Sequence, residues 1–309
     1  MLNKLRGILL PITTPFSFER VDHDALRVNI DRWSNSGIKG YVILGSTGER
    51  VHLDEREYLK VIETTRAAVP RKQRDGADDL AFIVGAGQHS VAGTINEIVR
   101  AAAAGAEAVL VITPHYYRAA ITQDALIDFY TAVADASPVP VLLYSMPALT
   151  GIKIEPATIA RLSEHQNIIG VKDSSNDVTK LAETIKLCPP DFAVLTGNGT
   201  VLLDALRAGA TGAILAVGCV MPEICVEIYD AFKNGDDDRA AALQTKLTPL
   251  AAAVTTKHGI GGLKAALDLA GYKGGSVRAP LRNADESARD EIALLLHECQ
   301  TSYKTVPTK

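Results

Sequence analysis

A lysine at the end of an apolar run is the residue of this sequence best placed to do chemistry. Lys172 closes the run Ile168–Lys172. Lysine is rarely buried, and burial at this position would disfavour the ammonium form and lower the pKa of the side chain. An unprotonated amine can attack a carbonyl carbon and form a Schiff base. The alternative is a structural lysine that reaches solvent or pairs with Asp173.

Two further segments carry side chains that could assist such an amine. Tyr144 ends another apolar run, and its phenol could move protons, although a buried tyrosine more often only packs. The segment Gly45–Glu49 offers the hydroxyls of Ser46 and Thr47 together with backbone N–H groups, a set that suits a carboxylate. The same residues are also common in ordinary turns. We expect Glu49 to order this loop rather than to act as an acid.

These residues need a fold that brings the ends of apolar runs together. Short apolar runs alternate with amphipathic segments, the pattern of parallel strands buried on both faces and covered by helices. We therefore predict an α/β fold, a (β/α)8 TIM barrel, whose site lies at the C-terminal ends of its strands. A doubly wound sheet is the alternative, but its GxGxxG helix start is missing. The predicted strands are Gly7–Ile12, Gly40–Leu44, Ala81–Gly85, Ala108–Thr113, Val139–Tyr144, Ile168–Lys172, Ala193–Thr196 and Gly212–Val217. The predicted helices between them include Asp22–Ser36, Asp54–Ala68, Thr122–Ala136 and Asp177–Leu187.

The last quarter of the chain shows a different pattern. From about residue 236 onward the periodicity is purely helical, in Asp236–Lys257, Gly261–Ala270 and Asp285–Gln300. We expect residues 1–235 to form the barrel with the active site and residues 236–309 to form a C-terminal helical extension. The extension should pack on the barrel or on a neighbouring subunit.

Composition narrows the classes of function. A net charge of -4 gives no basis for binding nucleic acid. No stretch is suited to be a signal peptide or a membrane span, so we expect a cytoplasmic protein with no membrane partner. The four cysteines lack CxxC spacing and should be free thiols of the core. The seven histidines show no HExxH motif and no other ligand spacing, so we expect no metal site.

Taken together, the predicted strand ends resemble the superfamily of dihydrodipicolinate synthase and N-acetylneuraminate lyase, class I aldolases that act through pyruvate. The resemblance covers nearly the whole chain, and the joint occurrence of its short motifs in this order is specific. The motifs are Pro11–Phe16, Gly45–Glu49, Thr113–Tyr117, Tyr144–Gly151, Gly170–Ser174 and Arg278–Leu281.

The resemblance implies roles for individual residues. Lys172 would be the Schiff-base lysine and Tyr144 the proton-transfer phenol; Thr47 would link two tyrosines in a relay, and Tyr116 would be lent by the neighbouring subunit. The implied substrate-binding residues are Ser46, Thr47 and Gly48 around the pyruvate carboxylate, Gly197 and Ile214 in the pyruvate pocket, and Ser174 near the distal part of the substrate. The resemblance also implies a homotetramer built as a dimer of dimers, pyruvate and an aldehyde as partners, and no cofactor.

Finer motifs distinguish members of the superfamily. Thr113–Arg118, Lys172–Ser174 and Gly259–Lys264 look most like 4-hydroxy-2-oxoglutarate aldolase, which implies cleavage of that compound to pyruvate and glyoxylate. The alternative is the synthase, which condenses pyruvate with aspartate semialdehyde. It has an arginine where this sequence has Leu149, and leucine cannot bind a carboxylate. A third hypothesis is a non-catalytic barrel that binds a keto acid.

Overall fold

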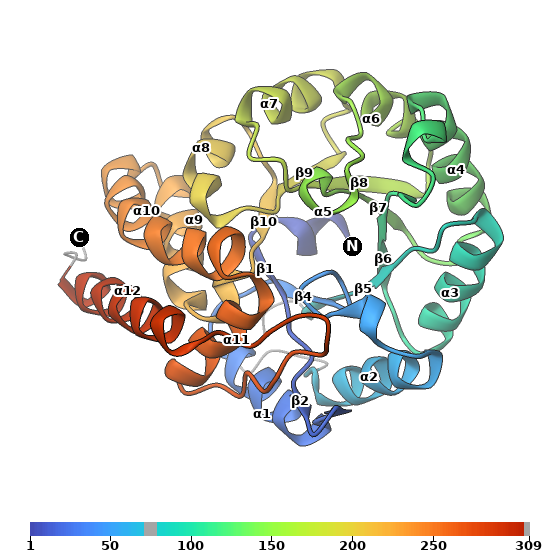
Figure 1. Cartoon of the computed structure of the whole chain (residues 1–309). Helices are drawn as coiled ribbons and strands as arrows, with labels where there is room; N and C mark the ends of the chain where they lie inside the picture. The colour runs from blue at the N-terminus through green and yellow to red at the C-terminus, as the bar shows by residue number, and fades with distance from the viewer. Residues whose placement is uncertain (71–78, 306–309) are drawn as a thin grey trace.

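The computed structural model describes residues 1–70 and 79–305, with side chains described as far as residue 301. Eight parallel strands close into a barrel in the order β1-β10-β9-β8-β7-β6-β5-β4, surrounded by helices (Figure 1). The predicted TIM barrel is thereby confirmed. The barrel strands are β1 (Ile8–Pro11), β4 (Gly40–Ile43), β5 (Ala81–Ala86), β6 (Ala108–Ile112), β7 (Val141–Ser145), β8 (Ile168–Asp173), β9 (Ala193–Thr196) and β10 (Gly212–Ile214).

Every predicted apolar run overlaps one of these strands, and only the ends differ. β7 begins at Val141 rather than Val139, just after Pro140, which has no N–H to donate to a neighbouring strand. β10 ends at Ile214 rather than Val217, because the chain turns there into the 3₁₀ helix η5 (Val217–Cys219). Small and branched side chains fill the barrel interior, among them Leu9, Val42, Ala108 and Leu195.

Several of the helices that alternate with the strands begin where the sequence places good N-caps. The side chains of Asp22, Thr122 and Asp177 each accept a hydrogen bond from the first turn, and Asp54 forms a capping box with Glu57. The helices of this layer are α1 (His23–Trp33), α2 (Glu55–Ala68), α3 (Val91–Ala103), α4 (Gln123–Ala136), α5 (Pro147–Thr150), α6 (Pro156–Leu162), α7 (Val178–Leu187), α8 (Leu202–Arg207) and α9 (Pro222–Lys233). Short 3₁₀ turns, η2 (Arg50–His52), η3 (Arg118–Ala120) and η4 (Gly199–Val201), follow β4, β6 and β9.

Two small elements lie outside the repeating pattern, and the sequence did not predict either. The 3₁₀ helix η1 (Leu2–Leu5) lies at one end of the barrel (Figure 1), and its Leu5 belongs to the interior cluster. The hairpin β2 (Phe16–Ser17) with β3 (Arg20–Val21) follows β1, and Phe16 forms a bridge with Ser276 near the other end of the chain. The hairpin therefore connects the start of the barrel to the C-terminal region.

The C-terminal extension consists of α10 (Asp237–Ala252), the π-helix η6 (Ala253–Lys257), α11 (Gly259–Leu269) and α12 (Glu286–Thr305). These helices lie together on one side of the barrel, and α10 packs against both α9 and α12 (Figure 1). Their buried side chains, such as Leu247, Leu263 and Ile292, belong to the same cluster as the outer core of the barrel. The extension therefore shares its core with the barrel.

The single helix predicted for Asp236–Lys257 is instead α10 followed by η6. Pro249 lies inside α10 and cannot donate to the carbonyl four residues earlier, and the regular helix ends at Ala252, within a turn of it. Within residues 1–70 and 79–305, no helix is both long and apolar enough to span a membrane. The four cysteines are buried and free, as expected.

Candidate active site

The lysine and the tyrosine singled out in the sequence are neighbours across two strands. Lys172 on β8 pairs in register with Tyr144 on β7, and residues in register on parallel strands project to the same side. The Nζ atom of Lys172 lies 4.5 Å from the centre of the Tyr144 ring. Both are buried, with exposed fractions of 5% and 3%. Tyr144 belongs to the cluster that fills the barrel, so the pair lies at the inner face of the strands' C-terminal ends.

Lys172 does not form the ion pair that a purely structural lysine would need. Among the described residues, no carboxylate lies within ion-pairing distance of its ammonium group. The carboxylate of Asp173 instead accepts a hydrogen bond of 2.6 Å from the backbone N–H of Ser175. Lys172 also acts on Cys219: burial raises the pKa of this thiol, and the positive charge of Lys172 opposes that rise. A buried lysine without an anionic partner is costly, as is typical of functional positions.

The hydroxyl that contacts Tyr144 comes from the loop after β4. Ser46 Oγ lies 2.9 Å from Tyr144 Oη, and either atom can donate in this hydrogen bond. The loop is tightly turned, because Leu44 is left-handed (φ 56°) and the N–H of Gly48 donates to the carbonyl of Gly45 at 3.1 Å. The structure therefore joins Ser46, Tyr144 and Lys172 in one chain of contacts.

The predicted relay through Thr47 includes a tyrosine of a second subunit, so this single chain shows only which hydroxyl lies next to Tyr144. The hydroxyl bonded to Tyr144 belongs to Ser46, not to Thr47, whose hydroxyl has no hydrogen-bond partner in the described part of the chain. Successive residues of a tight turn project in different directions, and the sequence gives no sign of which of two adjacent hydroxyls faces the strand. Thr47 itself is 7% exposed, and the next residue, Gly48, has its carbonyl bound by Thr14 Oγ1 at 2.7 Å.

Gly197 and Ser174 lie against the lysine. Gly197 directly follows β9, and a Cβ atom at this position would lie 1.9 Å from Ser174 Oγ and 2.8 Å from Lys172 Cε. Only glycine fits so close an approach. Ile214 lies on β10, is fully buried and belongs to the same interior cluster as Tyr144. The structure thus brings Gly197, Ser174 and Lys172 together, with Ile214 in the neighbouring interior.

The remaining candidate residues, Tyr116, Arg118 and Leu149, are exposed on the segments that follow β6 and β7. Tyr116 is 73% exposed and contacts His89 and Tyr117 through its ring. The side chain of Arg118 lies against Gly151, where an added Cβ would be 3.1 Å from the guanidinium Nη1. Leu149 on α5 is 61% exposed. No contact of Tyr116 with Tyr144 is seen within the described residues of this single chain.

Two buried hydroxyls at strand ends lie in motifs noted in the sequence but were given no role there. Thr13 follows β1 and Thr113 follows β6; both are fully buried, and neither Oγ1 atom has a hydrogen-bond partner. The signal that could have found them is a threonine directly after an apolar run. Apart from the masked stretches, no group of three or more His, Cys, Asp or Glu side chains is arranged to hold a metal ion.

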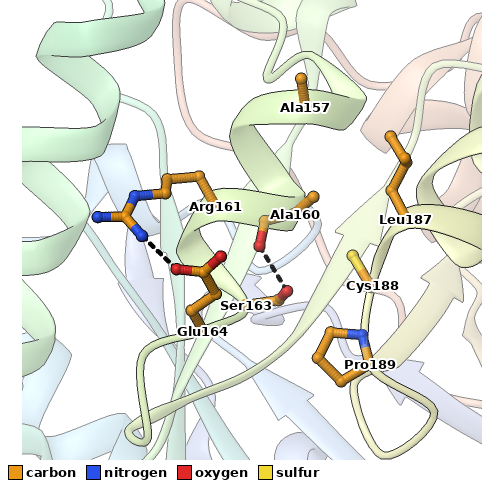
Figure 2. Close-up of a pocket in the computed structure, with 8 residues that line it drawn as sticks. All are labelled: Ala157, Ala160, Arg161, Ser163, Glu164, Leu187, Cys188 and Pro189. Carbon is orange, nitrogen blue, oxygen red and sulfur yellow. Dashed lines mark hydrogen bonds and ion pairs between the residues drawn. The ribbon is translucent and has the colours of Figure 1, made fainter.

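A hollow of about 590 Å³ lies elsewhere, on the outside of the barrel (Figure 2). It lies between α6 and the C-terminal end of α7, and an ion pair of Arg161 with Glu164 lies at its edge. Its lining residues are Ala157, Ala160, Arg161, Ser163, Glu164, Leu187, Cys188 and Pro189. None of these ends a barrel strand, so we assign the hollow to packing of the outer helices rather than to the site.

Comparison with known proteins identifies the group to which this arrangement belongs. Residues 4–299 match the Dihydrodipicolinate synthetase family. The chain belongs to this family. It is 34% identical to a 4-hydroxy-tetrahydrodipicolinate synthase of Syntrophus aciditrophicus (strain SB) over 287 residues, which are 93% of this chain and 96% of the relative.

Solved structures of this family share the fold. A dihydrodipicolinate synthase from Thermotoga maritima has a TM-score of 0.89 at 29% identity and covers 96% of this chain and 98% of its own. A prophage protein of the dihydrodipicolinic acid synthase family from E. coli K12, solved in complex with pyruvate, has a TM-score of 0.87 at 30% identity, with 96% and 98% covered. The chain is thus a lyase of the pyruvate-dependent class I type. The relatives' names favour the synthase, the alternative of the sequence analysis, over 4-hydroxy-2-oxoglutarate aldolase.

Proposed function

We propose that Lys172 binds pyruvate, or a 2-oxo acid that contains it, as a Schiff base. The observation that carries this proposal is the buried ammonium of Lys172 beside the Tyr144 ring, with no carboxylate partner among the described residues. The unprotonated amine of this lysine is the nucleophile of the proposed reaction. Tyr144, bonded to Ser46, is a neighbouring group able to carry a proton to or from the reacting atoms.

The proposed reaction passes through an imine and an enamine on Lys172. The amine of Lys172 attacks the C2 carbonyl, and loss of water gives a protonated imine. The imine draws the electron pair of the C3–C4 bond into an enamine while the C4 hydroxyl gives its proton to Tyr144 Oη, which passes its own phenolic proton along the hydrogen bond to Ser46, so that an aldehyde leaves. Protonation of the enamine at C3 and hydrolysis of the imine release pyruvate and restore the lysine. General-base help of this kind is typically worth about 10²–10⁴ in rate.

The surrounding residues provide a binding site for the pyruvate portion. We assign the carboxylate to the hydroxyls and backbone N–H groups of Ser46, Thr47 and Gly48, since convergent donors on a tight turn bind anions. Gly197 leaves room beside the Lys172 side chain, and Ile214 contributes an apolar wall. Ser174, which lies next to Gly197, is placed to bind the distal part of the substrate.

We propose 4-hydroxy-2-oxoglutarate as the preferred substrate, cleaved to pyruvate and glyoxylate. The supporting observation is Leu149 on α5, which follows the Tyr144 strand and presents an exposed apolar side chain. A bidentate grip on the carboxylate of aspartate semialdehyde requires a guanidinium, which leucine does not provide.

The second candidate is the synthase reaction, condensation of pyruvate with aspartate semialdehyde. The names of the relatives favour it. One structural observation also supports it: the guanidinium of Arg118 lies against Gly151, two residues beyond Leu149, and no ion pair occupies it within residues 1–70 and 79–305. Arg118 could therefore replace the missing arginine from a neighbouring loop.

The exposed Tyr116 fits a role that needs a second subunit. Its ring is 73% exposed and stands with His89 and Tyr117 in a cluster of aromatic side chains. Large exposed aromatic residues are enriched at protein interfaces. We propose that this cluster is covered in a homotetramer and that Tyr116 completes the site of the neighbouring chain.

Steady-state assays of purified protein test the proposed function. Release of pyruvate from 4-hydroxy-2-oxoglutarate is measured for the wild type, for Lys172→Met, and for the control Lys246→Met, which removes an exposed lysine of α10. We expect the wild type and the control to turn over and Lys172→Met to be inactive. Turnover by Lys172→Met would refute the proposal, and a wild type that binds pyruvate without turnover of either substrate would favour the non-catalytic barrel.

A further inference from the structure

A buried ion pair connects the C-terminal extension to the loop that carries Ser46. Lys264 lies on α11, and its Nζ atom is 2.5 Å from Glu49 Oε1, although the two residues are 215 positions apart in the sequence. Both side chains are 1% exposed. The chemistry proposed above uses neither residue.

Lys264 holds more than the carboxylate. Its ammonium also donates to the backbone carbonyls of Thr14 at 2.8 Å and Ser276 at 2.6 Å, so that all three of its donors are used. It lies 4.5 Å from the centre of the Phe16 ring. Three segments that are distant in the sequence therefore meet at one buried charge: the segment that follows β1, the loop after β4 and the chain after α11.

The approach of these segments is close. A Cβ atom at Gly274 would lie 2.0 Å from the carbonyl oxygen of Lys264, so the chain after α11 packs directly onto the helix that carries the lysine. The N–H of Ser276 then donates to the carbonyl of Phe16 at 2.9 Å. This packing leaves little freedom in the position of the ammonium group.

Glu49 is held equally firmly. Its Oε2 accepts a hydrogen bond of 3.1 Å from the N–H of Arg278 and lies 3.1 Å from His52 Nδ1. Its backbone is left-handed (φ 54°), a conformation that residues other than glycine rarely adopt. The ion pair therefore fixes a residue whose backbone would otherwise favour a different loop shape.

From Glu49 the contacts lead directly to the site. The N–H of Glu49 donates to the carbonyl of Ser46 at 3.1 Å, and Ser46 Oγ bonds to Tyr144 Oη. On the same side as Lys264, Thr14 bonds to the carbonyl of Gly48. Lys264 of the extension thus contacts this loop at Glu49, while Ser46 of the same loop contacts the phenol of Tyr144.

We propose that Lys264 is a positioning residue, which fixes the Gly45–Glu49 loop through Glu49 and Thr14 and so sets the position of Ser46 against Tyr144. The consequence for the proposed function, on which this inference rests, is that the C-terminal extension is part of the catalytic apparatus without touching the substrate. A buried ion pair is in general a weak source of stability compared with an apolar pair of the same volume; we infer that the role of this pair is to fix the geometry of the loop.

The test compares Lys264→Met, Glu49→Gln and the control Arg239→Met, which removes the ion pair of Arg239, on α10 of the extension, with Glu227 on α9. For Lys264→Met we expect faster amide hydrogen exchange across Gly45–Glu49. We also expect kcat with 4-hydroxy-2-oxoglutarate to fall about 10- to 100-fold in the folded fraction, because a misplacement of about 1 Å can cost 10²-fold in rate. Glu49→Gln, which keeps the shape and hydrogen-bonding capacity of the side chain, should show smaller changes in the same direction. Arg239→Met should keep wild-type exchange in the loop and wild-type kcat.

Two outcomes would overturn the inference. In the first, Lys264→Met, or Glu49→Gln where Lys264→Met does not fold, lowers the melting temperature but leaves loop exchange, kcat and KM at wild-type values. In the second, Arg239→Met loosens the loop as much as Lys264→Met does. Failure of the proposed function would look different: a wild type inactive on both substrates would leave the exchange comparison fully interpretable.

Discussion

Ser46 Oγ and Tyr144 Oη are joined by a 2.9 Å hydrogen bond across the barrel mouth, between residues 98 positions apart. The bond brings the loop after β4 to the phenol that faces Lys172. A phenol held in this way has a fixed orientation toward the lysine. Variants of Tyr144 and of the loop hydroxyls test this arrangement.

Replacing Tyr144 with phenylalanine should abolish most of the activity and leave the fold intact. The ring remains packed in the barrel, where Tyr144 is 3% exposed, while its proton is lost. We expect kcat to fall by about 10²–10⁴ with little change in the melting temperature. Near-wild-type turnover would return Tyr144 to a packing role.

Replacing each of the two adjacent hydroxyls of the loop should have a different kinetic effect. Ser46→Ala removes the partner of Tyr144 and should lower kcat by about 2- to 10-fold, the range expected for loss of one hydrogen bond. Thr47→Val keeps the shape of the side chain and should act mainly on the KM for pyruvate, through the carboxylate site. Steady-state kinetics of both variants show which hydroxyl affects kcat and which affects KM. A larger fall in kcat for Thr47→Val would restore the relay first predicted from the sequence.

Much of this site was visible in the sequence, for a physical reason. In a parallel barrel the side chains of a site follow the apolar runs, so the strand ends singled out Lys172, Tyr144 and the loop of Ser46 as candidates, and the family resemblance supplied their proposed roles. The caps at Asp22, Asp54, Thr122 and Asp177 likewise placed helix starts correctly. These features are local, and their residue types carry the signal.

Features that depend on distant contacts were not visible. Neither the choice between Ser46 and Thr47 nor the pairing of Lys264 with Glu49 leaves a local pattern, because each depends on how a side chain projects after the chain has folded. The break of the long C-terminal helix at η6 was also missed, although Pro249 in the sequence is a residue that often ends or bends a helix. Local periodicity continued across the break and concealed it.

Gly197→Ala should be severely impaired, because the new methyl group has no room. It would meet Ser174 Oγ at 1.9 Å and Lys172 Cε at 2.8 Å, so the lysine must move. Forcing an extra methyl group into a packed site typically costs about 1–3 kcal/mol, and we expect kcat/KM to fall by about 10- to 100-fold, the factor that corresponds to such an energy. In the double variant with Ser174→Ala, removal of the first clash should restore part of the folding stability. A fully active single variant would show that the lysine does not need its present position.

Substrate preference should respond to Leu149. The wild type should cleave 4-hydroxy-2-oxoglutarate with a higher kcat/KM than it shows for condensing pyruvate with aspartate semialdehyde. Leu149→Arg should raise the second value by about 10-fold, since a charged hydrogen bond contributes about 1.5–3 kcal/mol. The control Leu294→Arg changes an equally exposed leucine on α12 and should alter neither value. If the wild type prefers the semialdehyde and Arg118→Met removes that preference, the synthase is the correct assignment.

The most direct test of the central claim is to trap the Schiff base. Borohydride added to the wild type with pyruvate should reduce the imine to a stable secondary amine and inactivate the enzyme. Peptide mass spectrometry should find the adduct on the peptide with Lys172, and Lys172→Met should yield none. An inactivated enzyme with an unmodified Lys172, or an adduct on a different lysine, would contradict the account.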